Sequence, residues 1–506
     1  MVSLCNENRE DCLWKQKHVH ISEGSRPMKH DLSRRDFLRG IGLAAVSTLA
    51  SVSAPDKSRS TKRPNILFIT ADDLGLQLSC YGETLIQTPN MDKLAAEGVQ
   101  FQIAYVAQAS CSPSRSAMFT GLHTHSTGQY GLTNAGFALH PELRNKTIPN
   151  LLKASGYRTG IIGKLHVAPE ESFQFDFRDT NSGKTREVRW VAKRVEDFLR
   201  QTDDQPFFLM VNYSDPHAFR DPKDRRKWHF PPQVDGLPAD PLPPGEKTIF
   251  PFQQIDTPGQ RVRTAGYYNA VQRLDDGIGM LMDVLERRRH RNDTLVIFIG
   301  DHGPPFARGK TTVYEAGIRI PFIVRWPRIC KPMPSNAMVS TIDILPTILD
   351  ATGIELAGKM HGKSLRPVLK NANAPWRDYL VAEFHFHGSR PFYPRRAIRD
   401  HRYKLIHNLL AGKSRPSTGI DADPAYKVSQ QARYEDTPVR RAFNTFANPP
   451  EFELYDLEND PVEFDNLAGK AEYRAVQERL TRALLEYRKQ TEDPFLDPEF
   501  LEKTRR

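Results

Sequence analysis

The sequence predicts an α/β fold built on a large, mostly parallel β-sheet flanked by helices, and three observations support this. Four short apolar segments have the composition of buried strands: residues 64–70, 159–163, 207–211 and 295–299. Helical patterns lie between them, and strands that alternate with helices are typical of parallel sheets. Ionisable residues follow each apolar segment, as expected where ligands bind outside the carboxyl ends of parallel strands.

Helical segments fill the intervals between these strands. Apolar periodicity predicts helices at residues 90–97, 148–155, 188–201 and 267–289. The last one carries a single apolar stripe, formed by Tyr268, Val271, Leu274, Ile278, Leu281 and Leu285. Residues 219–261 are rich in proline, charge and aromatic side chains without periodicity, so we expect a long ordered loop over the catalytic face.

The pattern changes near residue 375. Short strand-like segments follow at residues 379–384, 395–398, 404–407 and 452–456, and a helical pattern covers residues 471–491. They predict a smaller C-terminal antiparallel sheet with a helix on it. We therefore expect a catalytic domain at 64–374 and a smaller domain at 375–506 that completes the substrate pocket. Residues 409–449 are polar and indicate little by themselves.

The N-terminal residues have the order of an export signal. Ser33-Arg34-Arg35-Asp36-Phe37-Leu38-Arg39 matches the twin-arginine pattern, and the mildly apolar stretch 40–54 ends in small residues that suit cleavage. That stretch is too short and too rich in Ala, Ser and Gly for a membrane-spanning helix. We predict an extension and signal peptide at 1–54, with Met28 as the natural start, and a linker at 55–63. The twin-arginine translocase of a bacterium would then export the protein to the periplasm or the exterior. The alternative is a chance pair of arginines in an N-terminal tail.

Charge and cysteine content narrow the class of protein. The 506 residues carry a formal net charge of +10, which suits anionic partners such as sulfated sugars, nucleic acid or anionic membranes. No Lys/Arg-rich run with interleaved aromatic residues is present, so we expect no nucleic-acid partner. Removal of the leader would leave Cys80, Cys111 and Cys330, an odd and unclustered set that argues against a disulfide framework or a cysteine zinc site.

Ionisable residues at two strand ends suggest a metal site. Asp72 and Asp73 follow the first predicted strand, and Asp301 and His302 follow the fourth. Carboxylate oxygens with one imidazole suit Ca²⁺ or Mg²⁺ better than a soft metal. An acidic pair alone would favour the start of a helix, and it is the second strand end, together with the cysteine motif described next, that favours the metal site.

One short segment carries a specific motif: Cys111-Ser112-Pro113-Ser114-Arg115, continued by Ser116-Ala117-Met118-Phe119 into Thr120-Gly121. It resembles the modification motif of the sulfatase family, in which a Cys is followed by x-Pro-x-Arg and then Thr-Gly. The resemblance implies that Cys111 is oxidised to formylglycine (3-oxoalanine) by a formylglycine-generating or sulfatase-maturating enzyme. The hydrated aldehyde would offer one hydroxyl for attack on sulfur and a second for expelling sulfate. The alternative is a buried free cysteine in a turn.

The same resemblance assigns roles to other residues. Arg115, Lys164 and Lys310 would supply the fixed cations that a sulfate transition state needs, although each alone would also suit a solvated surface position. His217 would donate a proton to the leaving group, and His166 would accept one when sulfate is expelled. Cys111, once modified, would join Asp72, Asp73, Asp301 and His302 around the metal, with Ca²⁺ favoured and Mg²⁺ as the alternative.

The resemblance extends from Pro64 to about Pro494 and covers nearly the whole mature chain. Within the alkaline-phosphatase superfamily it is strongest toward the N-sulfoglucosamine sulfohydrolases, through residues 111–132, 157–167, 292–298, 402–408 and 453–467. Two positions depart from that pattern: His302 replaces the usual Asn and Lys310 replaces the usual Arg. The second domain matches only loosely, and there His385, His387, Arg390 and Arg395 are candidates for contact with the sugar.

These observations predict an exported sulfatase that removes the N-sulfate of glucosamine from heparin- or heparan-like glycans. An O-sulfatase that acts on a sulfated polysaccharide keeps the same chemistry and is the first alternative. A phosphatase or phosphonate hydrolase of the same superfamily is the second, and an inactive glycan-binding relative is the third. The sequence leaves open whether the chain forms a homodimer.

Overall fold

The computed structural model describes residues 63–505, apart from 182, 203–204, 225, 356–357 and 390. Its large sheet has the order β10-β2-β9-β8-β1-β5-β3-β4. The strands are β1 (Asn65–Asp72), β2 (Val99–Tyr105), β3 (Arg158–Gly163), β4 (Phe177–Asp179), β5 (Phe207–Pro216), β8 (Thr294–Gly300), β9 (Phe322–Arg325) and β10 (Met333–Ser340). Only β9 pairs antiparallel to its neighbours, so the predicted, mostly parallel sheet is confirmed.

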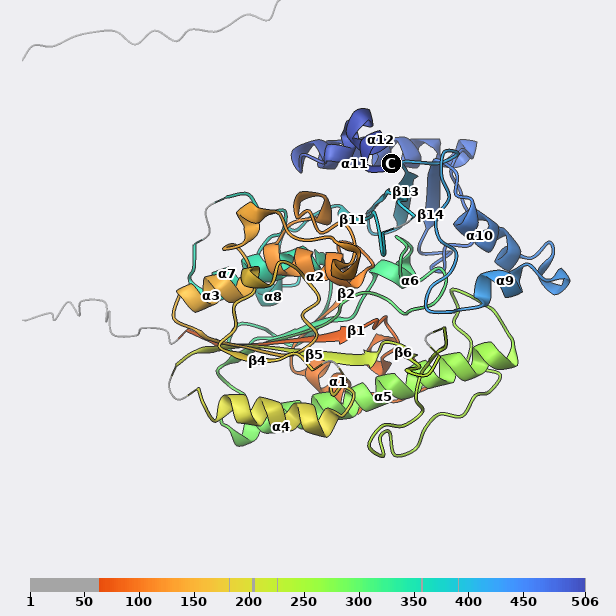
Figure 1. The fold of residues 1–506 in the computed structure, drawn as a ribbon. Coiled ribbons are helices and arrows are strands. Elements are labelled where there is room, and N and C mark those ends of the chain that lie inside the picture. The colour runs from red at the N-terminus through yellow and green to blue at the C-terminus, as the bar shows by residue number, and fades with distance from the viewer. Residues whose placement is uncertain are drawn as a thin grey trace, which may run out of the picture. The chain divides into compact units, whose positions relative to one another are not determined.

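Helices cover both faces of this sheet (Figure 1). Alternate side chains of β1 point to opposite sides, so that Ile66 and Phe68 pack in one apolar core and Leu67 and Ile69 in the other. The first core includes α2 (Cys111–Thr120), α3 (Ile148–Ala154), α7 (Ile344–Thr352) and α8 (Arg366–Lys370). The second includes α1 (Pro89–Ala96), α4 (Val188–Leu199) and α5 (Pro258–Arg287).

The smaller sheet has the antiparallel order β11-β12-β13-β14, as predicted. Its strands are β11 (Leu380–Phe384), β12 (Arg395–Arg399), β13 (Tyr403–Asn408) and β14 (Phe452–Asp456). One face packs on α11 (Arg474–Gln490), and the other packs on α9 (Ala425–Ser429) and α10 (Pro438–Ala447). The chain closes with α12 (Pro498–Arg505). From Lys62 onward the chain forms one compact unit, so the predicted domain boundary at 374 stays a prediction.

Several elements were missed by the sequence patterns. β2, β4, β9 and β10 were not predicted, because they are short or lie where polar residues interrupt the apolar run. α5 begins at Pro258 rather than at 267; the side chain of Thr257 accepts a hydrogen bond from Gln260 N and starts the helix before its apolar stripe begins. α9 and α10 lie within the polar region that carried no prediction.

The proline-rich region is largely irregular, as expected. It contains a two-stranded ribbon of β6 (Phe219–Arg220) and β7 (Trp228–His229) before α5 begins. The Trp228 ring lies 6.0 Å from the ring of His217, so this part of the loop reaches a predicted catalytic residue. No helix among the described residues is long and apolar enough to cross a membrane.

Candidate active site

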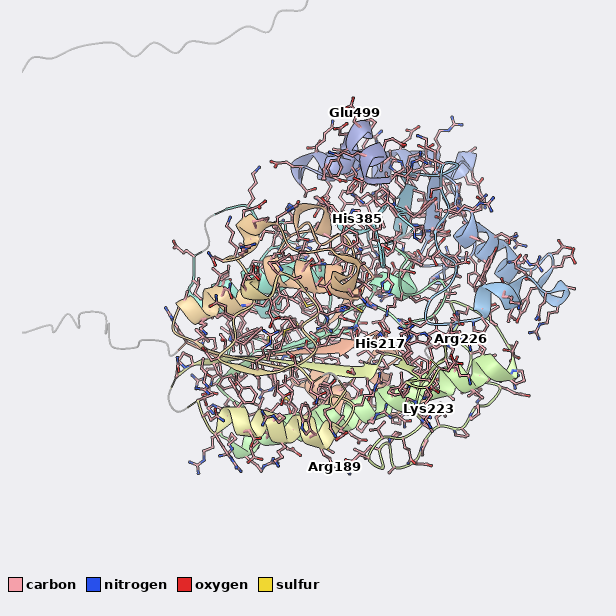
Figure 2. The ribbon with its side chains drawn as sticks, viewed as in Figure 1. Arg189, His217, Lys223, Arg226, His385 and Glu499 are labelled. Carbon is pink, nitrogen blue, oxygen red and sulfur yellow. The ribbon has the colours of Figure 1, made fainter. Side chains whose placement is uncertain are left out.

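The predicted site residues converge because their strands are neighbours. β1 pairs in parallel with both β5 and β8, and β5 also pairs with β3. The segments that follow these four strands therefore meet at one edge of the sheet. Figure 2 shows His217 there, near the end of β5.

Two site residues have left-handed backbone conformations. Asp73 has φ 68° and His166 has φ 55°, which is unfavourable for residues other than glycine. Gly163, the last residue of β3, has φ 91°, and a Cβ there would lie 2.2 Å from the carbonyl oxygen of Asn212. These sharp turns directly after β1 and β3 bring the polar side chains back over the strand ends.

Cys111 occupies the first position of helix α2, and Pro113 fits the first helical turn. The motif is thus helical in the folded protein, which its sequence did not reveal. The Sγ atom lies 3.3 Å from Nε2 of His302 and 3.6 Å from Oδ1 of Asp72. The positive end of the helix dipole favours negative charge at this position.

The predicted metal ligands form one buried cluster. Ligand atoms of Asp72, Cys111, Asp301 and His302 all lie within 4.8 Å of one another. Asp73 joins them, because its Oδ1 lies 3.3 Å from Nε2 of His302. Three buried carboxylates and one imidazole that face a common point have the donor chemistry of a hard divalent cation, so these residues fit Ca²⁺ or Mg²⁺.

All three predicted cations pair with this cluster. Arg115 donates to Asp301 Oδ2 over 3.0 and 3.2 Å, Lys164 Nζ lies 2.7 Å from Asp72 Oδ2, and Lys310 Nζ lies 2.9 Å from Asp73 Oδ1. Burial by itself would raise the pKa of Asp72, but the Lys164 ammonium holds that pKa well below its ordinary value. Asp72 is therefore ionised. Burial, followed by the charge of Asp72, instead raises the pKa of Asp301.

The histidines differ in exposure. The side chain of His217 is 20% exposed and its Nε2 lies 3.7 Å from Asp73 Oδ2, while its Nδ1 contacts the carbonyl oxygen of Ala218 at 2.7 Å. His166 is half-buried, and its Nδ1 has no hydrogen-bond partner among the described residues. Burial, followed by the charge of Lys164, lowers the pKa of His166 to about 3. Its ring is thus neutral and able to accept a proton.

His302 takes the opposite protonation state. Burial opposes its charged form, but Asp301, Cys111 and Asp73 together raise its pKa to about 9. Its Nδ1 contacts the carbonyl oxygen of Gly303 at 3.0 Å, which leaves Nε2 directed at the carboxylates. A divalent cation at this site would take the place of the proton on Nε2, and the orientation of the ring is the one that a ligating imidazole needs.

The four candidate sugar contacts fall in different places. His387 lies beside the cluster, with its Nδ1 2.9 Å from Oγ of Ser110. His385, labelled in Figure 2, is fully buried and stacks on Phe495 with ring centres 4.9 Å apart, and its contact with a sugar stays a prediction. Arg395 is buried at the start of β12. Arg390 lies outside the described residues.

Two further residues complete the site. Asn212 accepts from Arg115 Nη1 over 2.9 Å and from Thr70 Oγ1 over 2.6 Å. Its signal in the sequence is an amide inside an otherwise apolar strand. Asp421 places Oδ2 3.5 Å from Lys310 Nζ, and it comes from the polar region 409–449, where no sequence pattern distinguished it.

The comparisons agree with this geometry. The family model "Sulfatase" matches residues 64–354, and the model "N-sulphoglucosamine sulphohydrolase, C-terminal" matches residues 300–441. The human N-sulphoglucosamine sulphohydrolase is 32% identical over 85% of this chain and 91% of its own length. An N-acetylglucosamine-6-O-sulfatase from Bacteroides thetaiotaomicron is 27% identical over 89% of this chain and 90% of its own.

A solved structure shows the same fold. It is described as a complex with its substrate D-glucosamine-2-N,6-O-disulfate, superimposes with a TM-score of 0.61 at 24% identity, and covers 85% of this chain and 99% of its own. The chain therefore belongs to the sulfatase family. Within that family its sequence and its C-terminal region resemble the N-sulfoglucosamine sulfohydrolases.

Proposed function

We propose that this sulfatase removes the N-sulfate of glucosamine from heparin- or heparan-like glycans. The observation that carries the proposal is the position of Cys111, at the start of a helix and within 3.6 Å of both Asp72 and His302. The sequence similarity to the human N-sulphoglucosamine sulphohydrolase and the matching C-terminal family model support the choice of bond.

Two groups would supply the central chemistry. Asp72, Asp73, Asp301 and His302 would hold a divalent cation, with Ca²⁺ favoured and Mg²⁺ as the alternative, and that cation would polarise a sulfate oxygen. Formylglycine at position 111, made by a maturating enzyme, would provide the nucleophilic hydroxyl. The twin-arginine signal that we propose for export lies outside the described residues.

The chain's own residues position charge and protons. Arg115, Lys164 and Lys310 neutralise the sulfate as charge develops on its oxygens. Nε2 of His217, whose side chain is 20% exposed, delivers a proton to the leaving nitrogen, since Nδ1 is engaged by the carbonyl oxygen of Ala218. The neutral ring of His166 accepts the proton that must leave the side chain at position 111 when sulfate is released.

A second candidate is the hydrolysis of an O-sulfate on a sulfated polysaccharide. The 27% identity to an N-acetylglucosamine-6-O-sulfatase supports it. His302 and Lys310, which depart from the N-sulfoglucosamine sulfohydrolase pattern, also favour it. Arg and Lys bind an oxyanion with different geometry, because only the planar guanidinium of Arg offers two parallel hydrogen-bond donors.

Free sulfate release decides between the two. The protein is produced together with a formylglycine-generating enzyme and supplied in parallel with N-sulfoglucosamine and with 6-O-sulfated N-acetylglucosamine. Release from the N-sulfate alone supports the proposal, and release from the O-sulfate alone replaces it with the second candidate. We expect Cys111→Ala to abolish release from either sugar, and full activity of that variant would refute both mechanisms.

A further inference from the structure

A buried arginine at the start of β12 has no hydrogen-bond partner. Arg395 is 1% exposed, and its Nε, Nη1 and Nη2 atoms all lack a partner among the described residues. The guanidinium carbon lies 4.9 Å from the ring centre of Tyr393. Burial of a guanidinium without an acceptor is strongly unfavourable, so this position calls for an acceptor that the folded chain does not supply.

Two neighbouring polar atoms are unpartnered as well. They are Oη of Tyr393 and Oδ1 of Asn408, whose residue pairs with Arg395 across β12 and β13. Glu453 lies on the same face of the small sheet, but its carboxylate is already used. It accepts from Tyr314 Oη at 2.8 Å, Tyr455 Oη at 2.6 Å and Asn408 Nδ2 at 2.8 Å.

This cluster is connected to the candidate active site. Tyr393 N donates to the carbonyl oxygen of His385 over 3.2 Å, within the segment that joins β11 to β12. The same segment carries His387, which contacts Ser110 directly before Cys111. At Gly388, in the same segment, an added Cβ would meet no atom within 4 Å.

We propose that Arg395, Tyr393 Oη and Asn408 Oδ1 bind an oxyanion substituent of the glycan other than the sulfate that is cleaved. This inference rests on the proposed function, because it assumes an acidic glycan at the adjacent site. A guanidinium fork matches a carboxylate or a sulfate with two parallel hydrogen bonds. The tyrosine hydroxyl adds a third donor, and the asparagine oxygen accepts from a sugar hydroxyl.

Four substrates separate the two sources of that oxyanion. They are N-sulfoglucosamine, its disaccharide with a uronic acid, the same disaccharide with the carboxylate reduced to an alcohol, and glucosamine carrying both N- and 6-O-sulfate. The variants are Arg395→Gln, which removes the charge, and Arg395→Lys, which keeps the charge but loses the fork. Arg402→Gln is the matched control, since its side chain is 46% exposed on the same small sheet.

We expect Arg395→Gln to raise KM about tenfold for a substrate that carries the recognised oxyanion, and to leave N-sulfoglucosamine within about twofold. A higher KM of Arg395→Gln for the uronic acid disaccharide identifies the carboxylate as the recognised oxyanion. A higher KM for the disulfated sugar identifies the second sulfate instead. Arg395→Lys should lie between wild type and Arg395→Gln. The midpoint of thermal unfolding of Arg395→Gln should not fall, because this variant removes an unpaired buried charge. Equal changes on every substrate, or no change, would overturn the inference.

A binding measurement keeps this inference separate from the proposed function. If the wild-type protein releases no sulfate from any N-sulfated sugar, the proposed function fails. Calorimetry then compares binding of the uronic acid disaccharide and of the disulfated sugar to Cys111→Ala and to Cys111→Ala with Arg395→Gln. If the double variant binds one of these two sugars about tenfold more weakly than Cys111→Ala does, the oxyanion site is supported. Equal affinities of the two proteins refute it.

Discussion

At the scale of single residues, the site is a set of opposite charges held at close range. Lys310 lies between two carboxylates, because Asp73 and Asp421 contact the same ammonium at 2.9 and 3.5 Å. Asp421 has φ 45°, and its neighbour Ala422 has φ 59°. Unfavourable backbone conformations of this kind persist where surrounding contacts impose them. Here the carboxylate of Asp423 accepts from Ala307 N and fixes the segment.

We predict that Asp421→Asn lowers kcat about tenfold without raising KM. Burial opposes its charge, yet the Lys310 ammonium keeps the pKa of Asp421 below its ordinary value, so the pair is ionic. Loss of that charge leaves Lys310 less well oriented while making the site more attractive to an anionic substrate. Steady-state kinetics test this, with Asp436→Asn as the control, an exposed aspartate that also has a positive φ, of 61°. A higher KM with unchanged kcat would contradict it.

At the scale of elements, contacts between a helix and the end of a strand position the functional side chains. Asp215, near the end of β5, is clamped by Arg273 of α5 through contacts of 2.6 and 2.9 Å. Both side chains are fully buried. Arg186 adds a contact to the same carboxylate at 2.5 Å. The clamp fixes the turn that presents His217, two residues further along the chain.

We predict that Arg273→Leu lowers the free energy of unfolding by about 3–5 kcal/mol, because it leaves a buried carboxylate with only one cationic partner. The activity should fall as well, since the turn before His217 loses its anchor. Urea unfolding and sulfate release measure the two effects. Arg287→Leu on the same helix is the control: its side chain is 59% exposed, and a change of less than about 0.5 kcal/mol is expected. Similar losses for both variants would refute the special role of Arg273.

At the scale of the whole molecule, a buried ionic network joins the two sheets. Lys404 of the small sheet contacts Glu315 at 3.1 Å and Glu463 at 2.5 Å. Glu315 lies in α6 (Glu315–Ile318), and it also contacts Tyr105 of the large sheet and Arg399 of the small one. Burial and the charge of Glu315 outweigh Lys404 and raise the pKa of Glu463 to about 7. The network thus holds one ionised and one protonated carboxyl group at mildly acidic pH.

This protonation makes stability depend on pH. Between the ordinary pKa of a glutamate, 4.5, and about 7, the folded protein holds a proton on Glu463 that the unfolded chain has lost. The contribution of this group to stability therefore falls as pH rises through that window. We predict that the difference in the free energy of unfolding, Glu463→Gln minus wild type, rises by about 1–3 kcal/mol from pH 5 to pH 8. Chemical unfolding at several pH values measures this, and Glu458→Gln, 68% exposed, should show no such trend.

Much of the site could be predicted from the sequence because it lies next to strong local patterns. β1, β3, β5 and β8 are apolar runs, and the polar residues that follow them must meet once the strands are parallel neighbours. The motif at Cys111 is specific by its own residue spacing. The four short strands of the small sheet were predicted as well.

Tertiary structure alone decided the rest. Asp421 and Arg395 reach their positions through contacts between distant parts of the chain, which no local sequence pattern marks. His385 has the composition of a sugar contact, yet the packing of Phe495 encloses it. The sequence by itself therefore determined the family, the sheet and the catalytic cluster, because these depend on short-range patterns. The surroundings of the substrate depend on long-range packing, and only the folded chain defines them.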